Sequence, residues 1–262
     1  MHFVLYTQSS HPVAGHLSRG LSDAGHTVSV RNMKLWRGEL ERCDAVIVSG
    51  YRDIQRRIID AYDVPSLVVD WGYFARVNTP SERDTGYWQI SPYRLNNPPD
   101  FDCDSDRFEA TGLKVKQSSG KKDGYALVCG QMPMDAAVFD HDHAQWINEQ
   151  LAKYDNAVYR EHPRGGVKVK GTKTSNGSLD DALAGARIVV THNSNVGHEA
   201  LLSGVPVVCS ECAPYHCLSS EKIPSVAQRK CYFSRAAYGQ WLWSELADGV
   251  LFTMENLDRW NT

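Results

Sequence analysis

One strand–helix–strand stretch constrains the fold of this chain more than any other. The apolar run 187–191 is typical of a buried parallel strand, and the polar turn 192–195 follows it. The spacing then predicts a helix over 196–202 that ends at Gly204, and a second short strand over 205–209. Strand, helix and strand in this order form a βαβ unit, which indicates a parallel sheet in an α/β protein.

The polar residues of this unit lie where the first strand ends and the helix begins. Open α/β sheets bind ligands at the carboxyl ends of their strands. The amides in the first turn of a helix lack partners within the helix and carry positive potential, so they suit a phosphate. Ser194 and Asn195 stand at this helix start, and Glu199 follows one turn later, within reach of a ribose diol. Plain helix capping and stabilisation of the helix dipole are the alternatives.

Strand–helix alternation extends over both halves of the chain. It predicts strands over 2–6, 27–30, 44–48, 66–70, 125–129 and 157–160, and helices over 14–24, 52–62, 143–154, 179–184 and 234–246. The aromatic and polar segment 71–124, which ends in a linker over 117–124, interrupts this rhythm. We therefore expect two Rossmann-like domains facing each other across a cleft, 1–118 and 119–262, with the last helix packing back on the first domain.

Composition excludes several classes of protein. The chain has 262 residues, is 42% hydrophobic and 23% charged, and carries a net charge of −3, so no overall attraction to nucleic acid is expected. No apolar run reaches about 18 residues, and the N-terminal run lacks the features of a signal peptide, so we expect neither a membrane span nor export. Seven cysteines without a paired framework indicate reduced thiols in a cytoplasmic protein.

Two stretches contain residue types that bind metals. Residues 140–143 read Asp-His-Asp-His, but they coincide with a helix start, where acidic residues are common. Cys209, Cys212, His216 and Cys217 are all potential zinc ligands, but they lie within nine residues and have no second pair to complete a zinc knuckle. We expect no metal at either stretch.

The loops after the strands of the second half carry a set of short motifs. These are Leu-Val-Cys-Gly-Gln over 127–131, Arg-Glu-His-Pro over 160–163, Ser-Leu over 178–179, Asn-Ser-Asn over 193–195, Glu-Ala-Leu-Leu over 199–202 and Gly-Val-Pro-Val over 204–207. Together they resemble the donor half of GT-B glycosyltransferases, in the capsular polysaccharide Kdo- and sialyltransferase group and in phage-encoded enzymes. The phage resemblance extends to 70–73, 87–88, 106–108 and 238–241. Glu161, Gly197 and His198 depart from the usual pattern, which has a proline, a small residue and an apolar residue in these places.

The resemblance implies that the C-terminal domain binds a nucleotide sugar and the N-terminal domain binds the acceptor. By position, Gly130 would let the backbone approach the donor, His162 and Arg164 would contact its diphosphate or sugar, and the 194–195 pair would hold phosphate. The predicted donor site as a whole comprises Gly130, Gln131, Arg160, His162, Arg164, Thr191, Asn193, Ser194, Asn195 and Glu199. We expect a UDP-sugar first and a CMP-sugar second as substrate, with no tightly bound cofactor. Cationic groups and a helix N-terminus stabilise a departing phosphate without a metal.

An inverting transfer also needs a base for the acceptor hydroxyl. Asp70 ends the predicted strand 66–70 at the edge of the expected cleft. His11 and His16 are the alternatives, because imidazole titrates near neutral pH. Arg76 and Arg107 are candidate cations of the acceptor site. For each of the five, the structural alternative is a solvated side chain or one that braces a loop.

The acceptor hypotheses follow from the two groups of relatives. The similarity to phage enzymes over both halves favours the hydroxymethyl group of a modified pyrimidine, such as 5-hydroxymethylcytosine in phage DNA, acted on in the host cytoplasm. Lys168, Lys170 and Lys173 would then contact DNA phosphates, although a basic loop of this kind is more often solvated. A saccharide acceptor is the second hypothesis. A nucleotide-sugar-binding module without catalysis and an enzyme similar to UDP-sugar epimerases remain open, and the oligomeric state is not predicted.

Overall fold

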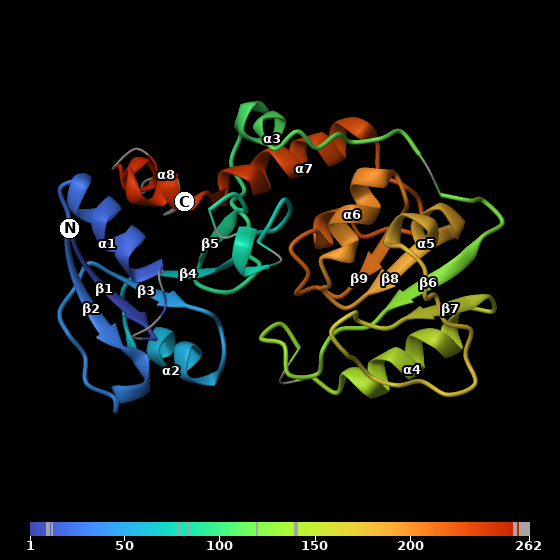
Figure 1. Cartoon of the computed structure of the whole chain (residues 1–262), viewed down its shortest axis with the longest axis horizontal. Coiled ribbons are helices and arrows are strands. Elements are labelled where there is room, and N and C mark those ends of the chain that lie inside the picture. Colours follow the sequence, from blue (N-terminus) through green and yellow to red (C-terminus); the bar gives the residue numbers. More distant parts are fainter. Residues whose placement is uncertain are drawn as a thin grey trace. The chain divides into compact units, whose positions relative to one another are not determined.

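The computed structural model describes residues 1–8, 11, 13–77, 79–82, 84–118, 120–138, 141–253 and 256. It divides into two compact units, Met1–Cys103 with Arg235–Thr262, and Asp104–Ser234. The linker in the sequence predicts a division between residues 118 and 119. Each unit is built on one sheet, with helices packed against it (Figure 1).

The sheet of the first unit is mainly parallel. Its strands are β1 (His2–Thr7), β2 (Thr27–Asn32), β3 (Ala45–Ser49), β4 (Ser66–Trp71), β5 (Trp88–Pro92) and β10 (Gln240–Trp241), in the order β10-β5-β4-β3-β1-β2. The strands β1 to β4 run parallel, β5 is antiparallel to β4, and β10 is antiparallel to β5. The helices are α1 (Val13–Asp23), α2 (Asp53–Ala61) and α8 (Trp243–Ala247), with short 3-10 helices at η1 (Met33–Leu35), η2 (Pro80–Glu82) and η4 (Val250–Phe252).

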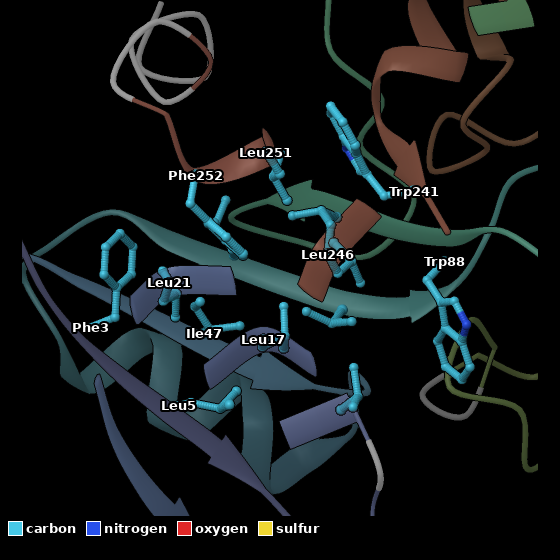
Figure 2. Close-up of a cluster of buried hydrophobic side chains, with 14 of the residues drawn as sticks. Phe3, Leu5, Leu17, Leu21, Ile47, Trp88, Trp241, Leu246, Leu251 and Phe252 are labelled. Carbon is cyan, nitrogen blue, oxygen red and sulfur yellow. The ribbon is translucent and has the colours of Figure 1, made fainter. Parts of the chain in front are cut away.

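Alternation along β1 sends its side chains into two separate cores. Phe3 joins the cluster that contains Leu17 and Leu21 of α1, as Figure 2 shows. Val4 joins the cluster that contains Ile58 of α2. Successive residues of a strand point to opposite faces of the sheet, so α1 and α2 cover opposite faces.

The C-terminal segment packs on α1 through a close backbone contact. A Cβ atom at Gly20 would collide with the carbonyl oxygen of Leu246 in α8. Gly249 has a φ of 72°, a left-handed conformation that glycine adopts readily. Leu251 and Phe252 enter the same core as α1 (Figure 2). The last residues that the structure describes therefore belong to the first unit.

The sheet of the second unit is parallel throughout its described strands. These are β6 (Tyr125–Cys129), β7 (Ala157–Arg160), β8 (Ala186–Thr191) and β9 (Val207–Cys209), in the order β7-β6-β8-β9. The helices are α3 (Asp106–Ala110), α4 (His143–Lys153), α5 (Leu179–Gly185), α6 (Val196–Ser203) and α7 (Val226–Tyr238), with the 3-10 helix η3 (His216–Leu218). The part of α7 from Arg235 onward belongs to the first unit. The αL conformation of Gly204 ends α6, as the sequence predicts.

The predicted α/β alternation is confirmed, with most bounds shifted by no more than two residues, but two segments differ. The segment 71–124 contains β5 and α3, which the sequence pattern does not predict. The predicted helix 234–246 is wrong: α7 begins earlier and ends at Tyr238, and β10 and α8 follow. A Cβ atom at Gly239 would meet Pro99 and Tyr73, and the Gln240 side chain accepts from the backbone N–H of Tyr73 at 3.0 Å. These contacts hold the chain extended where a helix was expected. None of the described helices has the length and apolar character that crossing a membrane requires.

Candidate functional site

The candidate site lies at the carboxyl edge of the second sheet. Parallel strands place the loops after β6, β7 and β8 at the same edge, where α/β proteins bind ligands. The loops after β6 and β7 lie against each other at Gly166. A Cβ atom added to this glycine would lie 3.3 Å from the backbone nitrogen of His162 and 3.5 Å from the backbone carbonyl oxygen of Gln131. The structure therefore brings together motifs that are 30 and more residues apart in the sequence.

A reciprocal pair of side chains joins the loops after β6 and β8. Gln131 donates from Nε2 to Oδ1 of Asn193 at 2.7 Å, and the Asn193 backbone N–H donates to Oε1 of Gln131 at 3.2 Å. The Asn193 amide also donates to the Ala137 carbonyl at 2.9 Å and to the Cys212 sulfur at 3.4 Å. The exposed fractions are 6% for Gln131 and 7% for Asn193. Both residues thus hold the loops in place, with their polar atoms already engaged.

His143, at the start of α4, holds the backbone of Gln131 through a hydrogen bond. Its Nε2 accepts from the Gln131 backbone N–H at 2.8 Å, so Nδ1 carries the proton of the neutral ring. Burial lowers the pKa of His143 to about 4, and repulsion by His141 acts in the same direction. Asp140 lies outside the described residues. Among the residues that are described, no three His, Cys, Asp or Glu side chains are grouped to hold a metal ion.

The backbone N–H groups at the start of α6 find hydrogen-bond acceptors in the same turn of the chain. Thr191 Oγ1 accepts from the Ser194 N–H at 3.1 Å, and Ser194 Oγ accepts from the Val196 N–H at 3.4 Å. The amides of Gly197 and His198 donate to the carbonyls of residues 194 and 195. Thr191 and Ser194 are buried. Thr191 thus holds the turn ahead of the helix, and Ser194 accepts from the first helical amide, whereas the N-cap residue Asn195 makes no side-chain capping bond. A phosphate would have to compete with the bonds of these amides. Glu199 is exposed in the first turn of the helix.

The loop after β7 contains the predicted cationic residues. Arg160 donates to the Gly177 carbonyl at 3.0 Å, which ties β7 to the segment ahead of α5. His162 is half-buried, and its Nδ1 accepts from the backbone N–H of the exposed Arg164 at 3.2 Å. A hydrogen bond from Lys168, at 2.7 Å, and the Gly166 amide lower the pKa of Glu161.

Packing explains why a glycine stands at position 130, whereas the prediction was that it lets the backbone approach the donor. A Cβ atom there would overlap the ring of Tyr159, whose hydroxyl donates to the Val167 carbonyl at 2.8 Å. The glycine therefore admits a neighbouring aromatic ring, and this packing alone explains its presence. No approach of a donor molecule needs to be invoked for it.

The candidate bases lie in the first unit. Asp70 is near the end of β4, and its Oδ1 accepts from the backbone N–H of Trp71 at 2.7 Å. The His11 ring lies 5.9 Å from the ring of Trp88, and the His16 ring lies 4.6 Å from that of Trp243. Because these two tryptophan rings are 4.9 Å apart, both histidines border one aromatic pair.

The predicted acceptor-site cations fall in different units. Arg76 lies in the first unit, with its guanidinium 5.9 Å from the ring of Trp71. Arg107 lies in α3 of the second unit. The structure therefore does not group these two side chains within one unit.

Two histidines that the sequence motifs do not mark also support the site. His192 contacts Ser210 Oγ at 2.7 Å and Cys212 Sγ at 3.3 Å, and its ring stacks on His141 at 4.2 Å. His198 is buried against α7. No short-range spacing reveals these contacts, because the hydrogen-bond partners of His192 are 18 and 20 residues away. The only sequence signal was the departure of His198 from the resembled pattern.

No family model matches the sequence, and no curated protein matches it significantly. Two solved structures from Thermosulfurimonas dismutans share its fold. One is a KpsC beta Kdo 2,4 transferase, with a TM-score of 0.57, 16% identity and 91% of each chain covered. The other is a KpsC beta Kdo 2,7 transferase, with a TM-score of 0.56 and 15% identity, covering 96% of this chain and 99% of that chain. The likeness shows a common fold over nearly the whole of both chains.

Proposed function

We propose that this protein is a glycosyltransferase of the GT-B type, which moves a sugar from a nucleotide-activated donor to the hydroxyl group of a saccharide. The observation that carries the proposal is the fold likeness, which covers more than nine-tenths of this chain and of two Kdo transferases. A shared fold alone does not fix a function. The second support is therefore local, in the three polar loops that meet at the carboxyl edge of the second sheet.

The proposed donor site uses these loops. Departure of a nucleoside phosphate leaves negative charge on its oxygens, and cationic groups aimed at that charge stabilise the transition state. Arg164 supplies a cationic group, and His162, whose Nδ1 accepts from the Arg164 backbone N–H, can donate a hydrogen bond from Nε2. Asn195 and Glu199 stand on the accessible side of the α6 start. Gln131, Thr191, Asn193 and Ser194 hold the loops in place in this proposal. Asp70 remains the proposed base, with His11 and His16 as alternatives.

A saccharide acceptor now takes precedence over phage DNA. The two neighbouring structures are named as Kdo transferases, so the group that they transfer is a sugar. Nothing in the comparisons supports a phage origin or a DNA acceptor. Lys168, a candidate for DNA contact, is hydrogen-bonded to the Glu161 carboxylate. Modified DNA is therefore kept as one arm of the test.

The first experiment is a thermal-shift screen with UDP-, GDP-, ADP- and CMP-sugars, CMP-Kdo included. A bound donor stabilises the folded protein by mass action, by about 2.7 kcal/mol at 100 times Kd. The donor that stabilises is then incubated with a saccharide panel and with duplex DNA containing 5-hydroxymethylcytosine. A mass increase of one sugar on a saccharide supports the proposal, whereas transfer only to DNA rejects the acceptor. If no nucleotide sugar stabilises the protein at millimolar concentration, the proposed donor site is wrong.

His162→Ala tests the donor site directly. We expect a loss of turnover of at least about 100-fold, the usual result of removing one group that stabilises developing charge. His216→Ala is the matched control, because His216 is an exposed histidine of the same unit outside the proposed site. Donor binding without turnover under any condition would indicate the binding module, and an epimerised donor without acceptor would indicate the epimerase-like enzyme.

A further inference from the structure

A buried hydrogen-bond chain connects α7 to the start of α6. Tyr232 on α7 contacts Nε2 of His198 through its hydroxyl at 2.8 Å, and Nδ1 of His198 contacts Oδ1 of Asn195 at 3.0 Å. The exposed fraction is 1% for His198 and 6% for Tyr232. The His198 ring also lies 4.7 Å from the ring of Tyr215, whose hydroxyl donates to the Ser194 carbonyl at 2.5 Å. His198 is thus enclosed on several sides at the edge of the proposed donor site.

The chain has a defined direction. A carboxamide oxygen only accepts hydrogen bonds, so Nδ1 of His198 must donate to Asn195. In a neutral imidazole the other nitrogen then accepts, and the Tyr232 hydroxyl donates to it. The direction therefore runs from the Tyr232 O–H through His198 to the Asn195 oxygen. The Nδ2 amide group of Asn195, which only donates, is not used in this contact.

We propose that His198 is a positioning residue for donor binding. Through Tyr232 it keeps the Asn195 oxygen turned inward, so that the Nδ2 amide is the group that meets the donor. The donor atom opposite Asn195 is then a hydrogen-bond acceptor such as a phosphate oxygen. The partial positive charge at the start of α6 favours the same choice. The ligand in this inference rests on the proposed function, whereas the hydrogen-bond chain does not.

The need for a histidine follows from the same contacts. Leucine would fill much of the space, but the Tyr232 hydroxyl would lose its acceptor and the Asn195 carboxamide would be free to rotate. A carboxamide that can present either end discriminates less between donors and acceptors on the ligand. Only histidine among the common side chains accepts at one ring atom and donates at another in this geometry. This explains why the chain departs here from the apolar residue of the resembled pattern.

The tautomer of His198 is the first test, and it needs no ligand. Nitrogen-15 NMR of the full-length protein reports which ring nitrogen carries the proton. We expect Nδ1 to be protonated and Nε2 to be bare, and Tyr232→Phe to perturb this ring far more than the other histidines. Protonation at Nε2, or at both nitrogens, overturns the proposed direction and with it the assignment of the presented amide.

The second test separates positioning from stability. His198→Leu should weaken the binding of CMP or UDP by about tenfold, the effect of one mispositioned hydrogen bond, and should lower the urea midpoint. In His198→Leu/Tyr232→Phe both buried polar partners are removed, so stability should recover. Nucleotide affinity should stay low. If stability and nucleotide affinity both recover in the double variant, His198 has only a structural role and the proposal is overturned.

His198→Asn is the conservative rescue. The asparagine amide nitrogen occupies the same position along the side chain as Nδ1, so it can still donate to Asn195. The Tyr232 hydroxyl loses its acceptor in this variant, so we expect a nucleotide affinity between those of the wild type and His198→Leu, whereas an affinity as low as that of His198→Leu would contradict the proposal. If the wild-type protein binds neither CMP nor UDP in calorimetry, the proposed donor site fails and the ligand assignment falls with it. The NMR result decides the hydrogen-bond chain in either case.

Discussion

Gln131 and Asn193 connect two loops of the second sheet through two buried hydrogen bonds. Gln131→Ala would leave the Asn193 backbone N–H and carboxamide oxygen buried without these partners. We expect the free energy of unfolding in urea to fall by about 2–3 kcal/mol. Gln145→Ala is the matched control, because Gln145 is exposed on α4 and its side chain donates to Glu149 one turn along the same helix. The free energy of unfolding of Gln145→Ala should differ from that of the wild type by no more than about 0.5 kcal/mol. Equal losses in Gln131→Ala and Gln145→Ala would contradict the expected role of Gln131.

His143 should make stability depend on acid pH. Its folded-state pKa of about 4 lies below the ordinary value of 6.5. Between these values the unfolded chain takes up a proton that the folded chain refuses, so stability is lost as the pH falls from 6.5 toward 4. At about 1.4 kcal/mol per pH unit, this residue accounts for a loss of about 3 kcal/mol.

His143→Gln isolates this contribution. The glutamine oxygen can accept the bond from the Gln131 amide, but the side chain does not titrate. The variant should lose about 3 kcal/mol less than the wild type in urea unfolding measured between pH 6.5 and 4. His216→Gln, on an exposed position of the same unit, should keep the wild-type slope. A wild-type slope in His143→Gln would show that His143 is protonated in the folded state.

The sequence predicts where individual polar residues lie in the fold, but it does not predict which side chains they contact. The polar residues at the strand ends do lie at one sheet edge, because a parallel sheet requires it. Their contacts depend on side chains far away in the sequence: Gln131 and Asn193 are 62 residues apart, and His198 and Tyr232 are 34 residues apart. Gly130 was assigned to the donor, although the ring of Tyr159 explains it. Local spacing contains no information on such pairs.

Two glycines of α1 should respond in opposite ways to alanine. Gly20→Ala places a Cβ atom against the α8 backbone, which cannot move without shifting the whole helix. We expect a loss of at least about 2 kcal/mol, as for other overpacked core positions. Gly15→Ala meets open space on the same helix and should stabilise by about 0.5–1 kcal/mol, because alanine is the better helix former. Urea unfolding of both variants checks this, and a stabilising Gly20→Ala would refute the close α1–α8 contact.

Long periodic elements were predictable, and short paired ones were not. Helices such as α1 and strands such as β1 have a clear apolar period that local sequence determines. Strand β10 has only two residues, and it exists because Trp241 pairs with Trp88, more than 150 residues earlier. The apolar residues of 234–246 suit a helix by spacing alone. The β5 ladder and the crowding at Gly239 override that preference.

The boundary between the two units depends on contacts between residues that are far apart in the sequence. The C-terminal segment returns to the first unit, and α7 runs from one unit into the other, since the division falls between Ser234 and Arg235. A linear reading places a boundary at the visible linker, here near residue 118. The structure instead keeps α3 and the linker with the second sheet, because the Arg229 guanidinium bonds the Gln117 carbonyl at 3.1 Å.

Donor binding by the second unit predicts a pattern over the whole molecule. With CMP or UDP at about 100 times Kd, segments that must open to exchange in the unbound protein should exchange up to about 100-fold more slowly. We expect this protection in the loops after β6, β7 and β8, measured by hydrogen–deuterium exchange and mass spectrometry of the full-length chain. The segment between β3 and α2 in the first unit is the internal control and should not change with nucleotide alone. Protection of that segment, with none at the second-sheet loops, would place the nucleotide in the first unit and reverse the proposed roles of the two sheets.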